Sequence, residues 1–291
     1  MRVFDLRGNP TEGCGLMGMD HGDTIMTKQL EQPLRLTTIS ARAKPVLGTA
    51  EQEVFYADAV KSILKARIPF LVAGTFAVSA YTGISRQTKD FDIFCKAGDW
   101  PRILSLFKEQ GDEIRIEDER WLGKVTRGNA TFDVIFGSSN GATPVSDLWF
   151  EHSRKGKALG QPVRFVSPTE LVWSKCFIQN RDRYDGADVA HLILRSHEEI
   201  DWVRLLQHME VHWEVLLMHL LNFRFIYPSE REKVPGWLMD ELLDRLMHQR
   251  RLPSPDKKIC RGRMFSSADF EIDVHKWGFT DIVGDSGGGS L

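Results

Sequence analysis

Residues 70–94 read FLVAGTFAVSAYTGISRQTKDFDIF, and this stretch contains the features that decide the fold. An apolar run breaks at Gly74-Thr75, a short helical segment follows, and a second apolar run begins with Asp90 and Asp92. Alternate residues of a strand point to the same face of a sheet. The two carboxylates at i and i+2 are therefore expected to project together from one side of a strand.

This pattern indicates a metal site beside a phosphate site. Two neighbouring carboxylates repel each other unless a cation lies between them, and hard divalent ions such as Mg²⁺ prefer oxygen ligands. The break at Gly74 presents free backbone N–H groups at a helix start, where phosphate oxygens bind well. Metal and phosphate together are typical of phosphoryl or nucleotidyl transfer.

A third carboxylate, Asp133, lies in the later alternating stretch Thr131 to Phe136. A charge among apolar neighbours is costly to bury unless it is paired or bound to a metal. Two interpretations stay open here, a metal ligand and one half of a buried ion pair. An exposed strand edge is the corresponding alternative for Asp90 and Asp92.

The combination resembles the nucleotidyltransferase superfamily, which includes DNA polymerase beta, the aminoglycoside nucleotidyltransferases and the AbiEii-type toxins. That family has an hG[GS] turn, a helix, a D-x-[DE] strand and a third carboxylate on a later strand. The turn here is Ala73-Gly74-Thr75, where a threonine replaces the usual serine or second glycine and keeps a hydroxyl. Arg86 to Ile93 matches the RxTxDxDI form of the AbiEii-like branch. The likeness covers about residues 68–193.

The resemblance implies a role for individual residues. The catalytic carboxylates, which would also bind Mg²⁺ or Mn²⁺, are Asp90, Asp92 and Asp133. The nucleotide-binding residues would be Gly74, Thr75, Arg86, Lys175 and Asp188. In this scheme Lys175 neutralises the triphosphate, and Asp188 orients Lys175 or another active-site group. An exposed helix with ordinary charge pairs is the alternative for these last two residues.

The expected function is that of a metal-dependent nucleotidyltransferase, an enzyme that moves an NMP from an NTP such as ATP to an acceptor hydroxyl. The acceptor class is open between an RNA such as tRNA, a protein and a small molecule. The AbiEii-like resemblance adds a toxin–antitoxin role with an antitoxin protein as partner. The alternative is a nucleotidyltransferase fold that has lost catalysis and serves as a binding or regulatory protein.

Composition narrows the class of protein. The 291 residues are 42% hydrophobic and 27% charged, which is ordinary for a soluble globular chain. The net charge of −2 gives no global nucleic-acid signature, although residues 250–263 form a basic run. The four cysteines form no C-x-x-C pair, which fits a reducing cytoplasm. The most apolar stretch, Trp213 to Tyr227, is too short and polar to cross a bilayer, so we expect a cytoplasmic protein without a membrane partner.

Periodicity predicts an α+β fold, with a small mixed β-sheet and flanking helices followed by a mainly helical C-terminal region. Strands are expected over residues 70–73, 91–95, 113–118, 131–136 and 163–166. Helices are expected over residues 52–66, 76–83, 100–109, 183–195, 200–224 and 237–248, and a further helix is expected to begin at Pro168. The corresponding domains are an irregular arm (1–48), a nucleotidyltransferase domain (49–167), a helical domain (168–283) and a flexible tail (284–291).

Overall fold

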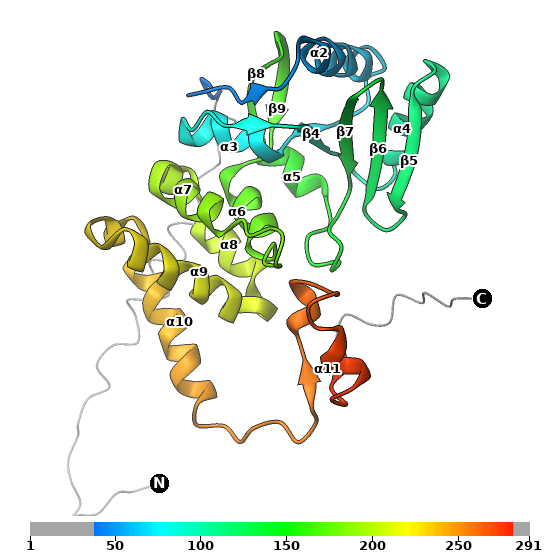
Figure 1. Ribbon diagram of the computed structural model, residues 1–291. Coiled ribbons are helices and arrows are strands. Elements are labelled where there is room, and N and C mark those ends of the chain that lie inside the picture. The colour runs from blue at the N-terminus through cyan, green and yellow to red at the C-terminus, as the bar shows by residue number, and fades with distance from the viewer. Residues whose placement is uncertain (1–37, 282–291) are drawn as a thin grey trace, which may run out of the picture. The chain divides into compact units, whose positions relative to one another are not determined.

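The computed structural model describes residues 38–281, which form a mixed sheet followed by a helical region (Figure 1). The strands of the main sheet are β2 (Leu71–Val72), β4 (Asp90–Phe94), β5 (Glu113–Asp118), β6 (Leu122–Arg127), β7 (Ala130–Ile135), β8 (Arg154–Ala158) and β9 (Gln161–Phe165). Their order across this seven-stranded sheet is β5-β6-β7-β4-β2-β9-β8. Strand β4 is antiparallel to β2 and parallel to β7, so the sheet is mixed, as predicted.

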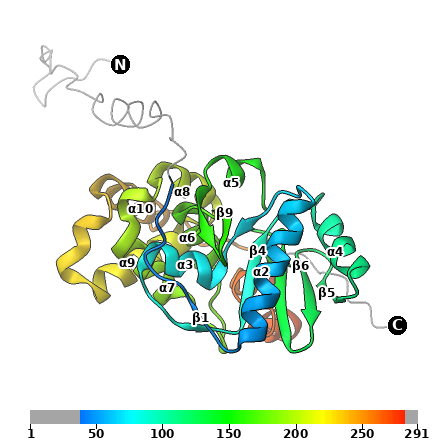
Figure 2. The ribbon, with the colours of Figure 1, turned by 90° about the horizontal axis from the view of Figure 1, so that it is seen from above.

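Two helices cover one face of the sheet, α2 (Ala50–Lys65) and α4 (Trp100–Glu109). Phe55 of α2 and Phe107 of α4 both make ring contacts with Phe132 of β7. Figure 2 shows α2 lying along this part of the sheet. Because residues alternate along a strand, the neighbours of Phe132 on β7 point to the opposite face. That opposite face contains the candidate site.

Helix α3 (Gly74–Thr82) follows β2 directly, and its two ends are set by glycines. Gly74 has a φ of +53° and Gly83 a φ of +82°, a region that side chains with a Cβ rarely adopt. Gly83 therefore ends the helix as its left-handed cap. The predicted turn–helix–strand unit is confirmed over residues 71–94.

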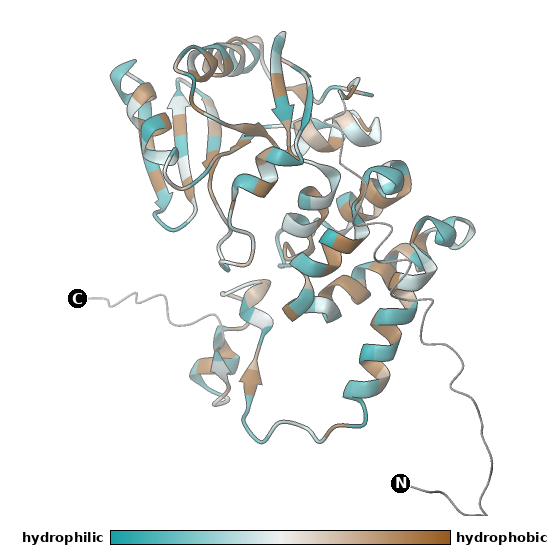
Figure 3. Ribbon diagram, turned by 180° about the vertical axis from the view of Figure 1, so that it is seen from behind, coloured by the Kyte–Doolittle hydropathy of each residue, from teal (hydrophilic) through white to brown (hydrophobic). Residues whose placement is uncertain are grey.

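The chain after β9 is mainly helical, and Pro168 opens this region at the first turn of α6. Its helices are α6 (Pro168–Cys176), α7 (Gly186–Ser196), α8 (Trp202–His208), α9 (Trp213–Ile226), α10 (Gly236–Gln249) and α11 (Glu271–His275). The short strands β10 (Ile259–Cys260) and β11 (Thr280–Asp281) pair with each other. Figure 3 shows hydrophobic and hydrophilic residues alternating along α10, whose buried residues are Leu238, Met239 and Leu242.

Several predicted boundaries were wrong. The helix expected from residue 183 begins at Gly186, because the Asn180 side chain accepts from the Asp182 and Arg183 N–H groups and forms a turn. The helix expected over 200–224 is interrupted by a 3-10 turn at Glu210–His212. Strands β6 and β8 and helix α5 (Asp147–Glu151) were not predicted. Both strands contain glycine and several charges, which have low strand propensity.

Part of the predicted N-terminal arm is ordered against the rest of the described chain. Strand β1 (Val46–Leu47) pairs with β3 (Gln87–Thr88), and Thr38 forms a bridge to Lys155. Residues 1–37 and the predicted tail lie outside the described residues. Within residues 38–281, no helix is long and apolar enough to span a membrane.

Candidate active site

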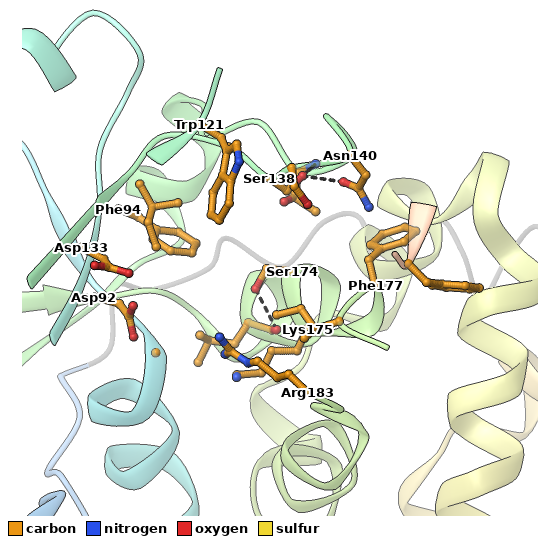
Figure 4. Close-up of a pocket in the computed structure, with 18 of the residues that line it drawn as sticks. Asp92, Phe94, Trp121, Asp133, Ser138, Asn140, Ser174, Lys175, Phe177 and Arg183 are labelled. Atoms are coloured by element: carbon orange, nitrogen blue, oxygen red, sulfur yellow. Dashed lines mark hydrogen bonds between the residues drawn. The ribbon is translucent and has the colours of Figure 1, made fainter. Parts of the chain in front are cut away.

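A cavity of about 320 Å³ lies between the free face of the sheet and the start of the helical region. Strands β4 and β7 form one wall, and α6 with the loop before α7 forms another. The turn at Met264 and Phe265, from the C-terminal part of the chain, completes the lining. Figure 4 shows side chains from these separate segments converging on one space.

Asp92 and Asp133 lie next to each other on the sheet side of this cavity (Figure 4). They are register partners on the parallel strands β4 and β7, so their backbones are about 4.8 Å apart. Burial raises the pKa of the Asp92 carboxyl to about 6, and the nearby negative charge of Asp133 adds to the rise. Burial also raises the pKa of Asp133, against the lowering effect of Lys124. The site therefore concentrates negative charge that a cation would stabilise.

Gly74 is the point at which α3 meets this carboxylate pair. A Cβ built on Gly74 would lie 1.7 Å from Asp92 Oδ2, so no side chain fits there unless the carboxylate turns away. The Ala73 N–H donates to the Asp92 carbonyl at 3.0 Å, which ties the start of the helix to β4. The first N–H groups of an α-helix have no partner within the helix, and at the start of α3 no side-chain cap supplies one. The helix therefore presents free donors beside Asp92.

Lys175 lies in a buried network of charges. Its Nζ atom is 2.6 Å from Asp185 Oδ2 and 2.9 Å from Asp188 Oδ2, and its side chain is 5% exposed. Arg86 holds both oxygens of Asp188, and Arg183 holds both oxygens of Asp185. Burial alone would raise the pKa of Asp188, but Arg86 and Lys175 hold it at about 2. Three cationic groups thus share two carboxylates, which leaves one positive charge in excess.

The structure brings together only part of the predicted site. The predicted residues that line the cavity are Gly74, Asp92, Asp133 and Lys175. The others, which lie outside its wall, are Asp90, Thr75, Arg86 and Asp188. Asp90 is exposed at the first position of β4. Packing of α6 against α7 explains how Lys175 and Asp188 meet, although they share no stripe in the sequence.

Residues that the sequence did not single out form most of the remaining wall. Phe94 and Trp121 lie above the carboxylates in Figure 4, and Phe177 lies farther from them. Met264 and Phe265 also line the cavity. The Asn140 side chain donates to the Met264 carbonyl at 2.7 Å and so ties the loop after β7 to the C-terminal turn. The run Gly137 to Gly141 is rich in turn residues and is the one signal of this loop in the sequence.

The donor set suits a divalent ion whose coordination a bound nucleotide completes. No group of three or more His, Cys, Asp or Glu side chains within residues 38–281 is arranged to hold a metal. Mg²⁺, however, is commonly bound by one or two carboxylates together with phosphate oxygens and water. Asp92 and Asp133 supply such a pair, and the raised pKa of Asp92 reflects charge that an ion would offset. Lys124 contacts both Asp133 oxygens in this structure.

Comparisons with known proteins give matches among solved structures. No protein-family model matches the sequence, and no curated protein matches it. The complex of ANT(2")-Ia with adenylyl-2"-tobramycin is 14% identical, with a TM-score of 0.42, over 61% of this chain and 99% of that one. Lincomycin-bound LnuA, a lincosamide antibiotic adenylyltransferase, is 15% identical with a TM-score of 0.37, over 50% and 96%. An antigenic nucleotidyltransferase-like protein from Paracoccidioides brasiliensis is 13% identical with a TM-score of 0.40, over 64% and 93%.

Proposed function

We propose that this protein is a nucleotidyltransferase that moves a nucleoside monophosphate from an NTP to an acceptor hydroxyl. One observation carries the proposal: the paired carboxylates Asp92 and Asp133 lie beside the free N–H groups of α3 in a single cavity. Carboxylates attract a cation, and unpaired N–H donors attract an anion. A triphosphate with a bound metal ion supplies both. The cations Lys175 and Arg183 line the same cavity.

The phosphates would be bound by the chain's own donors. The first-turn N–H groups of α3, at Gly74 and Thr75, would donate to phosphate oxygens, which the helix dipole also favours. Arg183, with a side chain 63% exposed, is the cation most able to reach a ligand. Lys175 is held by two carboxylates, so we propose that it acts mainly by maintaining the excess positive charge of its network.

In the proposed reaction, an oxygen of the acceptor attacks the α-phosphorus in line with the leaving group. A new O–P bond forms, the bond between the α-phosphorus and pyrophosphate breaks, and the hydroxyl proton passes to solvent water. Mg²⁺ or Mn²⁺ would be held by Asp92 and Asp133 and would supply Lewis-acid stabilisation of the phosphate charge. Asp90, two residues before Asp92 on β4, would lie near the ion. The aromatic side chains Phe94 and Trp121 would shield this region from water.

The cavity favours a small acceptor with little net charge. Among the described residues, its charged lining consists of two acids and two bases, namely Asp92, Asp133, Lys175 and Arg183. Beyond these, the wall is largely apolar or aromatic, with serine and asparagine side chains. A polycation would find no further acid there once Asp92 and Asp133 bind a metal. An RNA or protein acceptor, and an antitoxin partner, have the sequence resemblance and the basic run 250–263 as their only support.

Transfer from α-³²P-labelled NTPs with Mg²⁺ would test the proposal. Purified protein would be offered each NTP with a panel of small neutral hydroxyl compounds, and separately with total tRNA and with protein. We expect label to enter an acceptor with the wild type and not with Asp92→Asn or Asp133→Asn. Nucleotide binding that is absent in the wild type, with or without Mg²⁺, would contradict the proposal.

One observation favours the alternative of a binding protein without catalysis. The Lys124 ammonium neutralises the charge of Asp133, as expected for a site that binds no metal ion. Such a protein would bind nucleotide equally well in Mg²⁺ and in EDTA. A nucleotidyltransferase would bind the nucleotide more tightly with Mg²⁺, and this comparison separates the two.

A further inference from the structure

Lys124 and Asp133 face each other across two neighbouring strands. They are register partners on β6 and β7. The Lys124 Nζ atom lies 2.7 Å from Oδ1 and 2.9 Å from Oδ2 of Asp133. Both side chains are largely withdrawn from solvent, with exposed fractions of 26% for Lys124 and 14% for Asp133. The ammonium therefore holds both of the oxygens that Asp133 would offer to a metal ion.

Asp92, the neighbour of Asp133 on the other side, has no such counter-ion. Within residues 38–281, no ammonium or guanidinium group lies within ion-pair distance of Asp92, and Lys175 and Arg183 act on its charge from farther away. Two adjacent carboxylates thus share a single contacting cation. A divalent ion between them would match both negative charges, which Lys124 alone does not.

We propose that Lys124 is a positioning residue that holds Asp133 in the metal-free protein and competes with a divalent cation for the two Asp133 oxygens. This inference rests on the proposed function, because it takes Asp92 and Asp133 as the residues that bind the ion. An ammonium group that contacts both oxygens takes up lone pairs that a metal ion would use, and its positive charge repels the ion. Lys124 therefore lowers the affinity of the resting site for free metal and leaves Asp133 when the metal binds.

Replacing Lys124 by Met should have two opposite effects. Met has similar length but no charge, so the Asp133 carboxylate loses its partner in a poorly solvated place and the metal-free protein melts at a lower temperature. The same change removes the competitor, so Mn²⁺ binds more tightly. Because a ligand that binds only the folded state raises the melting temperature, saturating Mn²⁺ should narrow or close the gap to the wild type.

The test is a Mn²⁺ titration of the full chain, followed by electron paramagnetic resonance of the free ion, with melting curves in EDTA and in Mn²⁺. Lys124→Met should lower the Kd for Mn²⁺ on the order of tenfold, which corresponds to about 1.4 kcal/mol. Lys124→Arg keeps a cation that can hold both oxygens and should leave the Kd near or above the wild-type value. The matched control is Lys108→Met at the exposed end of α4, which should change neither readout.

The double variant Lys124→Met/Asp133→Asn shows whether the effect depends on Asp133. If it does, Lys124→Met should raise the Mn²⁺ affinity of the wild type but not that of Asp133→Asn. An equal or weaker affinity in Lys124→Met would overturn the inference. The proposed function would survive that result if Asp92→Asn still abolished Mn²⁺ binding in the wild-type background. If neither the wild type nor Lys124→Met bound Mn²⁺, either alone or together with a non-hydrolysable NTP, both the inference and the metal-dependent function would be wrong.

Discussion

Replacing Asp92 by Asn should stabilise the metal-free protein at neutral pH, although it should abolish transfer. The pKa of Asp92 is raised from its ordinary 3.8 to about 6 by burial and by Asp133. A carboxyl whose pKa is higher in the folded state binds its proton first in that state, so its ionisation costs stability as pH rises from about 4 to about 7. At about 1.36 kcal/mol per pH unit, this rise in pKa lowers the free energy of unfolding by about 3 kcal/mol once the carboxyl is fully ionised. Asn has a similar shape but does not ionise, so the variant does not lose this stability.

Urea denaturation in EDTA at pH 4, 5, 6, 7 and 8 would measure the effect. The free energy of unfolding of Asp92→Asn minus that of the wild type should be near zero at pH 4 and rise to about 2–3 kcal/mol by pH 7. Asp118 offers a control of opposite sign, because Arg120 lowers its pKa to about 2 against the effect of its partial burial. Asp118→Asn should therefore destabilise the protein at neutral pH.

Two results would refute this reasoning about Asp92. One is an Asn variant no more stable than the wild type at pH 7. The other is a gain that does not change with pH, since that would place its origin outside the titration of the carboxyl. Addition of Mg²⁺ should raise the melting temperature of the wild type and leave that of Asp92→Asn unchanged, because Asp92→Asn lacks a carboxylate ligand to the ion.

The remaining predictions concern the turn, the charge network and the basic run. Lys175→Ala should lower the free energy of unfolding, measured in urea, by about 3 kcal/mol, because two buried carboxylates lose a shared partner. It should also weaken NTP binding on the order of tenfold to a hundredfold. An unchanged denaturation midpoint would contradict the buried network. Gly74→Ala should abolish Mn²⁺ and nucleotide binding, whereas Gly111→Ala, with a φ of +88° and open space around it, should reduce stability alone; equal nucleotide affinities in calorimetry would count against the site. For an RNA acceptor, serine substitutions in the basic run should lower the slope of log K against log salt by roughly 0.7–0.9 per lost phosphate contact, as filter binding would show; a constant slope would mean that the run is a solvated loop. The substituted residues are Arg250, Arg251, Lys257 and Lys258.

The local part of the site was predictable because it depends on neighbouring residues. The glycine turn and the alternation of Asp90 and Asp92 specify one helix start and one strand face. Asp133 could be assigned to the same sheet because its apolar neighbours alternate. That it lies directly beside Asp92 is a matter of strand order and register, which a single sequence does not encode locally.

The rest of the site depends on packing between distant segments. Lys124 lies on β6, a strand with glycine and charge that periodicity did not reveal, so its contact with Asp133 was not foreseen. Of the two possibilities left open for Asp133, the structure shows the ion pair, with Lys124 as the partner, at the wall of the cavity; the role of metal ligand stays a proposal. Met264 and Phe265 reach the cavity from more than a hundred residues downstream of β7.

Anomalous diffraction from crystals soaked with Mn²⁺ and a non-hydrolysable NTP would test the central claim most directly, because it needs no knowledge of the acceptor. The account predicts a Mn²⁺ peak bridging the Asp92 and Asp133 carboxylates, phosphate oxygens at the first-turn N–H groups of α3, and a Lys124 ammonium that has left Asp133. A nucleotide bound elsewhere, or one bound in this cavity with Lys124 still on Asp133 and no Mn²⁺ peak, would contradict it.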